Sequence, residues 1–137
     1  MRDTWLGLRH VALRVTDVER AEAFYTGLFG MSVEWKPDPD NVYLTSGQDN
    51  IALHRVETLP AAGDGALDHV GFMVTTADAV DTWRERAAAH GAEIVQDIKT
   101  HRDGARSFYL RDSEGNTIQI IHHPPLERLP AGPDPRG

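Results

Sequence analysis

Two histidines, His10 and His69, occupy equivalent places in two similar stretches of this 137-residue chain. Each lies near the start of a short apolar segment, 8–16 in one stretch and 67–75 in the other, and a helix-like segment follows each. Imidazole is the side chain that proteins most often use to bind metal ions. An imidazole at the same place in both copies of a motif predicts a site that the two copies share.

The similarity between the two stretches continues beyond the histidines. The matching residues drift in separation from 59 to 66: Val11 and Val70, Phe24 and Trp83, Gly30 and Gly91, Tyr43 and Tyr109, Asn50 and Asn116. Loops of unequal length in the two copies would produce such a drift. The sequence therefore predicts a duplicated supersecondary unit.

Each copy has the pattern of a strand, a helix and three further strands. Thr16 followed by Glu19 has the form of a capping box, and Thr75 or Thr76 is expected to cap the second helix. Glycines at 30 and 91 are expected to end the helices. The later strands are expected at 33–35, 41–45 and 51–56 in the first copy, and at 94–95, 107–110 and 117–121 in the second.

Strand alternation places the two histidines on polar faces. Successive side chains of a strand point to opposite faces, so His10 and Arg14 lie opposite the valine and leucine side chains of their strand. By the same rule His69, His54 and Gln119 are expected on the face away from the aliphatic residues. The aliphatic face needs a covering helix, whereas the small and polar residues of the histidine face suit a cleft.

The composition excludes several classes of function. With no cysteine, the chain has no disulfides, zinc fingers or thiol nucleophiles. No apolar run is long enough to span a membrane, and residues 1–4 lack the apolar stretch of a signal peptide, so a cytoplasmic location is expected. A formal net charge of −7 argues against nucleic acid as a partner, because phosphate binding needs a basic face.

Four segments together resemble the vicinal oxygen chelate superfamily, which includes glyoxalase I, extradiol dioxygenases, fosfomycin resistance enzymes and bleomycin resistance proteins. They are His10–Asp17, Ala23–Met31, Leu67–Phe72 and Tyr109–Gln119. The resemblance implies an α+β fold. Two tandem βαβββ modules would form a curved, eight-stranded mixed sheet around a cleft, with helices on the convex side.

The resemblance and the repeat predict one domain over residues 1–123, with module one at about 7–60 and module two at about 66–123. Residues 61–65 are expected to form a flexible link between the modules. Five prolines follow Ile121 and no periodicity accompanies them, so residues 124–137 are expected to form an irregular tail.

Superfamily members that bind metal place ligands on the first and fourth strands of each module. Carried over to this sequence, those ligands are His10, His54, His69 and Gln119, and they would bind one divalent ion such as Zn, Ni, Fe or Co. Placing His54 requires one extra residue in the first module's turn. Gln119 stands where glutamate is the usual residue, and an amide is unable to act as a general base.

Other side chains are assigned to the substrate or to the surface. Arg14, Tyr43, His101 and Tyr109 are candidates for substrate binding, with a solvated or core position as the alternative for each. The pair His122 and His123 precedes two prolines and is interpreted as a surface feature.

Three functions remain open. The first is a metal-dependent enzyme, of lyase, isomerase or dioxygenase type, in which a Lewis-acidic ion chelates two neighbouring oxygens of a small substrate. The second is a non-catalytic binder of a bleomycin-type antibiotic, and the third is a metal-free enzyme or a relic of one that keeps only the fold. The expected partners are a small molecule and a second copy of the chain, with no nucleic acid or membrane. The modules could pair within one chain or between two chains of the homodimer.

Overall fold

A computed structural model of the chain describes residues 4–61 and 65–127. These residues form two compact units, the first ending at Leu59 and the second beginning at Pro60. Most of the predicted link, at 62–64, and most of the predicted tail, from 128 onward, lie outside the described residues. Each unit is described by itself below.

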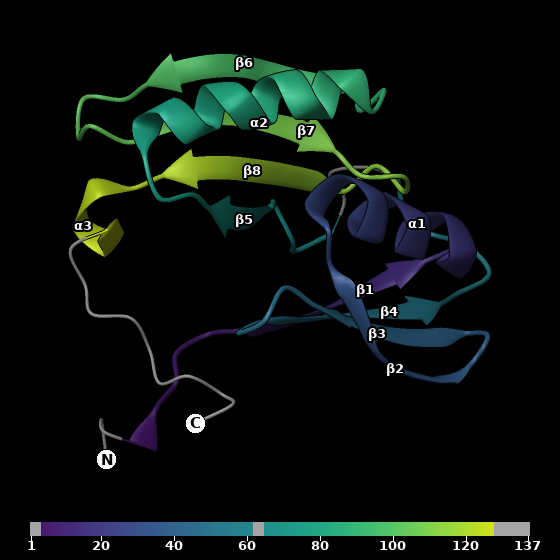
Figure 1. The fold of residues 1–137 in the computed structure, drawn as a ribbon. Coiled ribbons are helices and arrows are strands. Elements are labelled where there is room, and N and C mark those ends of the chain that lie inside the picture. The colour runs from purple at the N-terminus through teal and green to yellow at the C-terminus, as the bar shows by residue number, and fades with distance from the viewer. Residues whose placement is uncertain (1–3, 62–64, 128–137) are drawn as a thin grey trace. The chain divides into compact units, whose positions relative to one another are not determined.

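Both units have the order strand, helix, strand, strand, strand (Figure 1). The first unit contains β1 (His10–Val15), α1 (Val18–Phe29), β2 (Ser32–Asp38), β3 (Asn41–Thr45) and β4 (Asn50–Arg55). The second contains β5 (Val70–Met73), α2 (Ala77–Ala89), β6 (Ile94–Thr100), β7 (Arg106–Arg111), β8 (Thr117–His122) and the short α3 (Pro124–Glu127). The prediction of an α+β fold with two βαβββ modules is confirmed.

The eight strands form two four-stranded mixed sheets, one in each unit. The strand orders are β1-β4-β3-β2 and β5-β8-β7-β6, and in each sheet the first pair is parallel and the others antiparallel. Each sheet thus has β1, which begins at His10, or β5, which follows His69 directly, beside the module's last strand. The duplication inferred from the sequence is a duplication of topology.

The helices begin and end where local chemistry dictates. Asp17, and not the predicted Thr16, caps α1: its side chain accepts a hydrogen bond from the Arg20 backbone N–H at 3.0 Å. Thr76 caps α2 through a bond from the Ala79 N–H at 3.1 Å, as predicted. Gly30 ends α1 with a φ of 69°, a left-handed conformation that favours glycine.

Each helix covers the aliphatic face of its own sheet (Figure 1). In the first unit, helix residues such as Tyr25 and Leu28 are buried with strand residues such as Leu13 and Leu53. The second core is built in the same way, from the buried residues Val80, Ala87, Phe108, Leu110, Ile118 and Ile120. Burial of apolar surface on one face fixes which side chains remain on the other.

The predicted irregular tail begins with one turn of helix, α3, over Pro124–Glu127. Proline is tolerated in a first helical turn because the missing N–H has no partner there in any case. The expectation of irregular structure from residue 124 is therefore wrong for these four residues. Among the described helices, none has the length and apolar character needed to cross a membrane.

An ion pair joins α2 to β7 in the second unit. Arg106 donates two hydrogen bonds to Asp81, from Nη2 to Oδ1 at 2.7 Å and from Nε to Oδ2 at 3.1 Å. The hydrogen bond from Arg106 lowers the pKa of the Asp81 carboxyl below its ordinary value. A carboxyl whose pKa is lowered in the folded state increases the free energy of unfolding at pH values above its unfolded-state pKa of about 3.9. This contribution disappears as the pH falls through the lower folded-state pKa.

We expect Asp81→Asn and Arg106→Gln each to lower the melting temperature slightly near neutral pH, because the pair is partly exposed. The double variant should lose less than the sum of the two single losses. The measurement is a double-mutant cycle of melting temperatures, repeated at a pH below the folded-state pKa of the Asp81 carboxyl, where the coupling should vanish. Coupling that is the same at both pH values would contradict the assignment.

Candidate metal and substrate site

His10 is oriented by an asparagine that a carboxylate holds in turn. The register of the parallel pair β1–β4 places Asn50 opposite His10, and Asn50 Oδ1 lies 2.7 Å from His10 Nδ1. The Asn50 amide nitrogen donates to Glu34 Oε2 at 2.9 Å. An ionised carboxylate only accepts hydrogen bonds, so this contact directs the amide oxygen toward the histidine. Nδ1 of His10 is therefore the donor.

His54 has the same arrangement on the neighbouring pair of strands. The antiparallel pair β3–β4 places Asn41 opposite His54, with Oδ1 2.6 Å from His54 Nδ1. The Asn41 amide nitrogen donates to both carboxylate oxygens of Asp38, at 3.0 and 3.2 Å. Tyr43 packs edge-on against the His54 ring, with the centroids 5.9 Å apart. This imidazole too is fixed as the Nδ1–H form.

His69, immediately before β5, is held by a carboxylate directly. Its Nδ1 lies 2.6 Å from Asp68 Oδ2, and the Tyr109 ring packs edge-on against it at 5.4 Å. In a neutral imidazole whose Nδ1 carries the proton, Nε2 carries the lone pair. In the neutral form of each of the three rings, the Nε2 lone pair would therefore be left for a ligand. A histidine that donates its other N–H to an oxygen is the usual arrangement for a metal ligand.

The strand register shows how far the two copies match. Gln119 pairs with Gly71, two residues beyond His69, and also faces Tyr109 on β7. The corresponding residue of the first unit pairs with Ala12, two residues beyond His10, and is Ala52. His54 instead pairs with Arg14, two residues further along the strand. His54 therefore shares a face with His10 without being the counterpart of Gln119.

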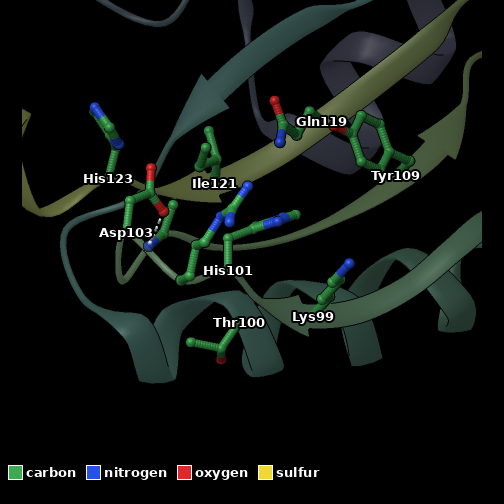
Figure 2. A pocket seen from close by; sticks show the side chains of 10 residues that line it. Lys99, Thr100, His101, Asp103, Tyr109, Gln119, Ile121 and His123 are labelled. Atoms are coloured by element: carbon green, nitrogen blue, oxygen red, sulfur yellow. Dashed lines mark hydrogen bonds between the residues drawn. The ribbon is translucent and has the colours of Figure 1, made fainter.

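A cavity of about 750 Å³ lies on the Gln119 face of the second unit. Its lining includes Tyr109, Gln119 and Ile121 from β7 and β8, together with His101 and other residues of the β6–β7 turn (Figure 2). The predicted site residues of this unit, His101, Tyr109 and Gln119, are thus brought together. In the first unit, Arg14, Tyr43 and His54 lie side by side on one face.

Several residues around the cavity were not identified from the sequence. Lys99, Arg102, Asp103 and His123 also line it. The missed signal was a local reversal of charge, since Lys99, His101 and Arg102 form a basic run in an acidic chain. The surface interpretation of His122 is wrong: it is 8% exposed, because it shares the inner face of β8 with Ile118 and Ile120.

The donor atoms fit a divalent ion of intermediate softness, because imidazole nitrogen and an amide oxygen suit such metals. Within residues 4–61 and 65–127, no three His, Asp or Glu side chains gather closely enough to form a metal site by themselves. Each unit described alone supplies only part of the expected set: His10 and His54 in the first, His69 and Gln119 in the second.

Comparison with known proteins identifies the family. The family model described as the Glyoxalase/Bleomycin resistance protein/Dioxygenase superfamily matches residues 7–120. The chain belongs to this superfamily. The matched region spans both units and contains His10, His54, His69 and Gln119. The resemblance inferred from the sequence motifs is confirmed.

Individual members of the superfamily are similar at the level of sequence or fold. A trivalent organoarsenical cleaving enzyme of Bacillus sp. (strain MD1) is 29% identical over 117 residues, covering 82% of this chain and 71% of the relative. The fosfomycin resistance protein FosX of Listeria monocytogenes is 22% identical with a TM-score of 0.73, covering 90% and 98% of the two chains. Lactoylglutathione lyase of Agrobacterium tumefaciens is 23% identical with a TM-score of 0.71, covering 85% and 92%. The last two similarities show a shared fold.

The hydrogen bonds of the three histidines lead to a prediction about their tautomers. In metal-free protein at mildly alkaline pH, long-range proton–nitrogen correlation spectra should show His10, His54 and His69 as Nδ1–H forms. Asn50→Ala should shift His10 toward the Nε2–H form that free histidine favours in water, while His54 stays unchanged as the internal control. An Nε2–H form of His10 in the unaltered protein would contradict the arrangement.

Proposed function

We propose that the chain is a metal-dependent enzyme in which a divalent ion binds a small substrate through two neighbouring oxygens. Superfamily membership supports this proposal, because members usually use a divalent metal and bind small molecules. The observation that carries it is the kind of hydrogen bond that the histidines share. Nδ1 of His10 and Nδ1 of His69 each contact a side-chain oxygen, which in the neutral ring leaves the Nε2 lone pair for a metal ion.

We further propose His10, His69 and Gln119 as the ligands. Gln119 pairs two residues beyond His69, about 7 Å along the strand, which is close enough for two side chains on one face to reach a common ion. His54 pairs four residues beyond His10, about 13 Å along the strand. Metal–nitrogen bonds are only about 2.0–2.1 Å long, so the register favours leaving His54 out of the metal's coordination shell.

Bound there, the ion would act as a Lewis acid that stabilises negative charge developing on the substrate oxygens. Asp68 and Asn50 would act as positioning residues, since they fix the orientation of His69 and His10. Gln119 could hold the ion through its amide oxygen but could not accept a proton. A substrate that arrives already ionised would need no base at this position.

The substrate of the Bacillus relative is not carried over to this chain. Trivalent arsenic binds thiolates strongly, and this sequence contains no cysteine. Substrate oxygens are better suited to a divalent ion that is held by imidazole nitrogens and an amide oxygen, which are the donors this chain offers.

We predict that His10→Ala or His69→Ala protein, purified without a chelator or a histidine tag, loses most of its bound divalent metal. Metal content is measured by mass spectrometry of the dialysed protein. His90→Ala is the matched control, because His90 is an exposed residue at the C-cap of α2. His54→Ala should also retain the metal if the register assignment is correct. Unaltered metal content in both of the first two variants would refute the ligand set.

A second prediction concerns charge at the metal. Imidazoles and an amide leave the positive charge of the ion uncompensated, so catechol, which loses protons as its two oxygens chelate an ion and has no carboxylate, should bind the metal-loaded protein and not the metal-free protein. Gln119→Glu adds a competing negative charge and should weaken this binding about tenfold or more. Isothermal titration with catechol as the probe, with and without metal, provides the measurement. Catechol binding that is independent of metal would end the proposal.

The alternative function is that of a non-catalytic antibiotic-binding protein. It would require metal-independent binding of a cationic glycopeptide such as bleomycin, and the anchored histidines give no reason to expect this. The same titration can compare bleomycin with catechol, each with and without metal. A homodimer also stays a prediction, in line with the frequent dimerisation of superfamily members.

A further inference from the structure

The β6–β7 turn of the second unit differs sharply from its counterpart in the first. Two residues, Pro39 and Asp40, connect β2 to β3, and acidic residues flank and occupy that turn. Five residues, 101–105, connect β6 to β7, and the basic run Lys99, His101 and Arg102 lies at this connection. Two copies of one module have therefore acquired opposite charge at the same place.

The second turn is held in one conformation by its own hydrogen bonds. The His101 N–H donates to the Ala105 carbonyl at 2.7 Å, and the Gly104 N–H donates to the His101 carbonyl at 2.9 Å. Gly104 has a φ of 90°, a left-handed conformation that favours glycine. A turn fixed in this way needs no further ordering of its backbone when a ligand binds.

Two cations at this connection, Lys99 and Arg102, differ in their partners from three arginines of the same unit. Arg84, Arg106 and Arg111 each pair with a carboxylate. Among the described residues, no carboxylate lies within ion-pair distance of Lys99 or Arg102. The neighbouring Asp103 uses its Oδ1 to accept a bond from the Ala105 N–H at 3.0 Å. In a chain with a net charge of −7, unpaired cations beside a cavity indicate a site for an anion.

The same cavity reaches Gln119. The register of the sheet places Lys99 opposite Ser107 on β7, on the face that carries Tyr109 and Gln119. His101 Nε2 lies 3.4 Å from the Ser107 hydroxyl, which orients the ring beside the turn. Figure 2 shows Lys99, His101, Tyr109 and Gln119 around one hollow. A single ligand in this hollow can contact both the basic turn and the Gln119 amide.

We propose that the β6–β7 turn binds a carboxylate of the substrate, separate from the oxygens that chelate the metal, and so selects carboxylate-bearing substrates. Lys99 and Arg102 supply the charge, and the planar Arg102 guanidinium suits bidentate contact with a carboxylate. This inference rests on the proposed function only for the identity of the oxygens at the other end of the substrate. The carboxylate subsite itself depends on the second unit alone.

Two probes that differ only in one charged group test the inference. They are 3,4-dihydroxybenzoate and its neutral isostere 3,4-dihydroxybenzamide, each titrated calorimetrically into zinc-loaded and metal-free protein. We expect the acid to bind about tenfold more tightly than the amide to the zinc-loaded protein, and this preference should weaken at high salt. The double variant Lys99→Gln/Arg102→Gln should abolish the preference, chiefly by weakening the binding of the acid. Arg20→Gln/Arg86→Gln, two exposed changes on α1 and α2, removes the same charge away from the cavity and should keep the preference.

The two hypotheses fail in distinguishable ways. Equal affinity for the acid and the amide in the unaltered protein overturns the carboxylate subsite, whatever the effect of zinc. Affinity for both probes that is independent of zinc overturns the proposed function, whatever the preference for the acid. Backbone amide resonances of residues 100–105 provide a second measurement: they should shift on addition of the acid to metal-free protein, and their failure to shift would also overturn the subsite.

Discussion

The chemistry available to this protein depends on anchoring imidazole rings through side-chain oxygens. His69 is held directly by a carboxylate, whereas His10 and His54 are each held by an asparagine whose amide nitrogen contacts a carboxylate. The carboxylates accept only, so each network has one consistent direction of donation, with Nδ1 of the imidazole as the donor. Without these contacts the rings would rotate and exchange tautomers, and a ligand would have to meet the cost of ordering them.

Duplication supplied two copies of the anchoring strand, and divergence gave them different neighbours. The position that pairs two residues beyond the histidine is Ala52 in the first unit and Gln119 in the second. The alanine side chain has no atom that can bind a metal, so at this position the first unit offers no second ligand beside the imidazole of His10. The second unit contributes an imidazole, an amide and a cavity that the amide lines. The two copies have thus kept one topology while their residues at this position differ in chemistry.

The charge that the cavity favours in a ligand depends on the residues around it and not on the net charge of the chain. The net charge of −7 would by itself suggest a cationic ligand, but the acidic residues are largely used elsewhere. Asp38 and Glu34 orient asparagines, Asp81 and Asp97 pair with arginines, and Asp103 accepts from the backbone. At the cavity the two cations Lys99 and Arg102 outnumber the one carboxylate of the lining, Asp103. Because fields in a pocket depend on the nearest unpaired charges, this local balance outweighs the total.

Local sequence patterns predict the duplicated βαβββ order, the faces on which His10, His69 and Gln119 lie, and the end of the first helix at Gly30, and they leave Thr75 and Thr76 as alternative caps of the second helix. These features follow from periods of two and 3.6 residues and from local backbone chemistry. Alternation also bears on His122, since Ile118, Ile120 and His122 must share a face. Local sequence does not distinguish Asp17 from Thr16 as the cap of α1, because both side chains can cap a helix. The burial of Val18 fixes where the first turn begins and so selects Asp17. The register of β1 and β4, which separates His54 from the counterpart of Gln119, is visible only in the folded sheet. The same is true of the turn that brings Lys99 and Arg102 to the cavity. Register and turn geometry depend on hydrogen bonds between segments far apart in the chain, which alternation along one strand does not specify.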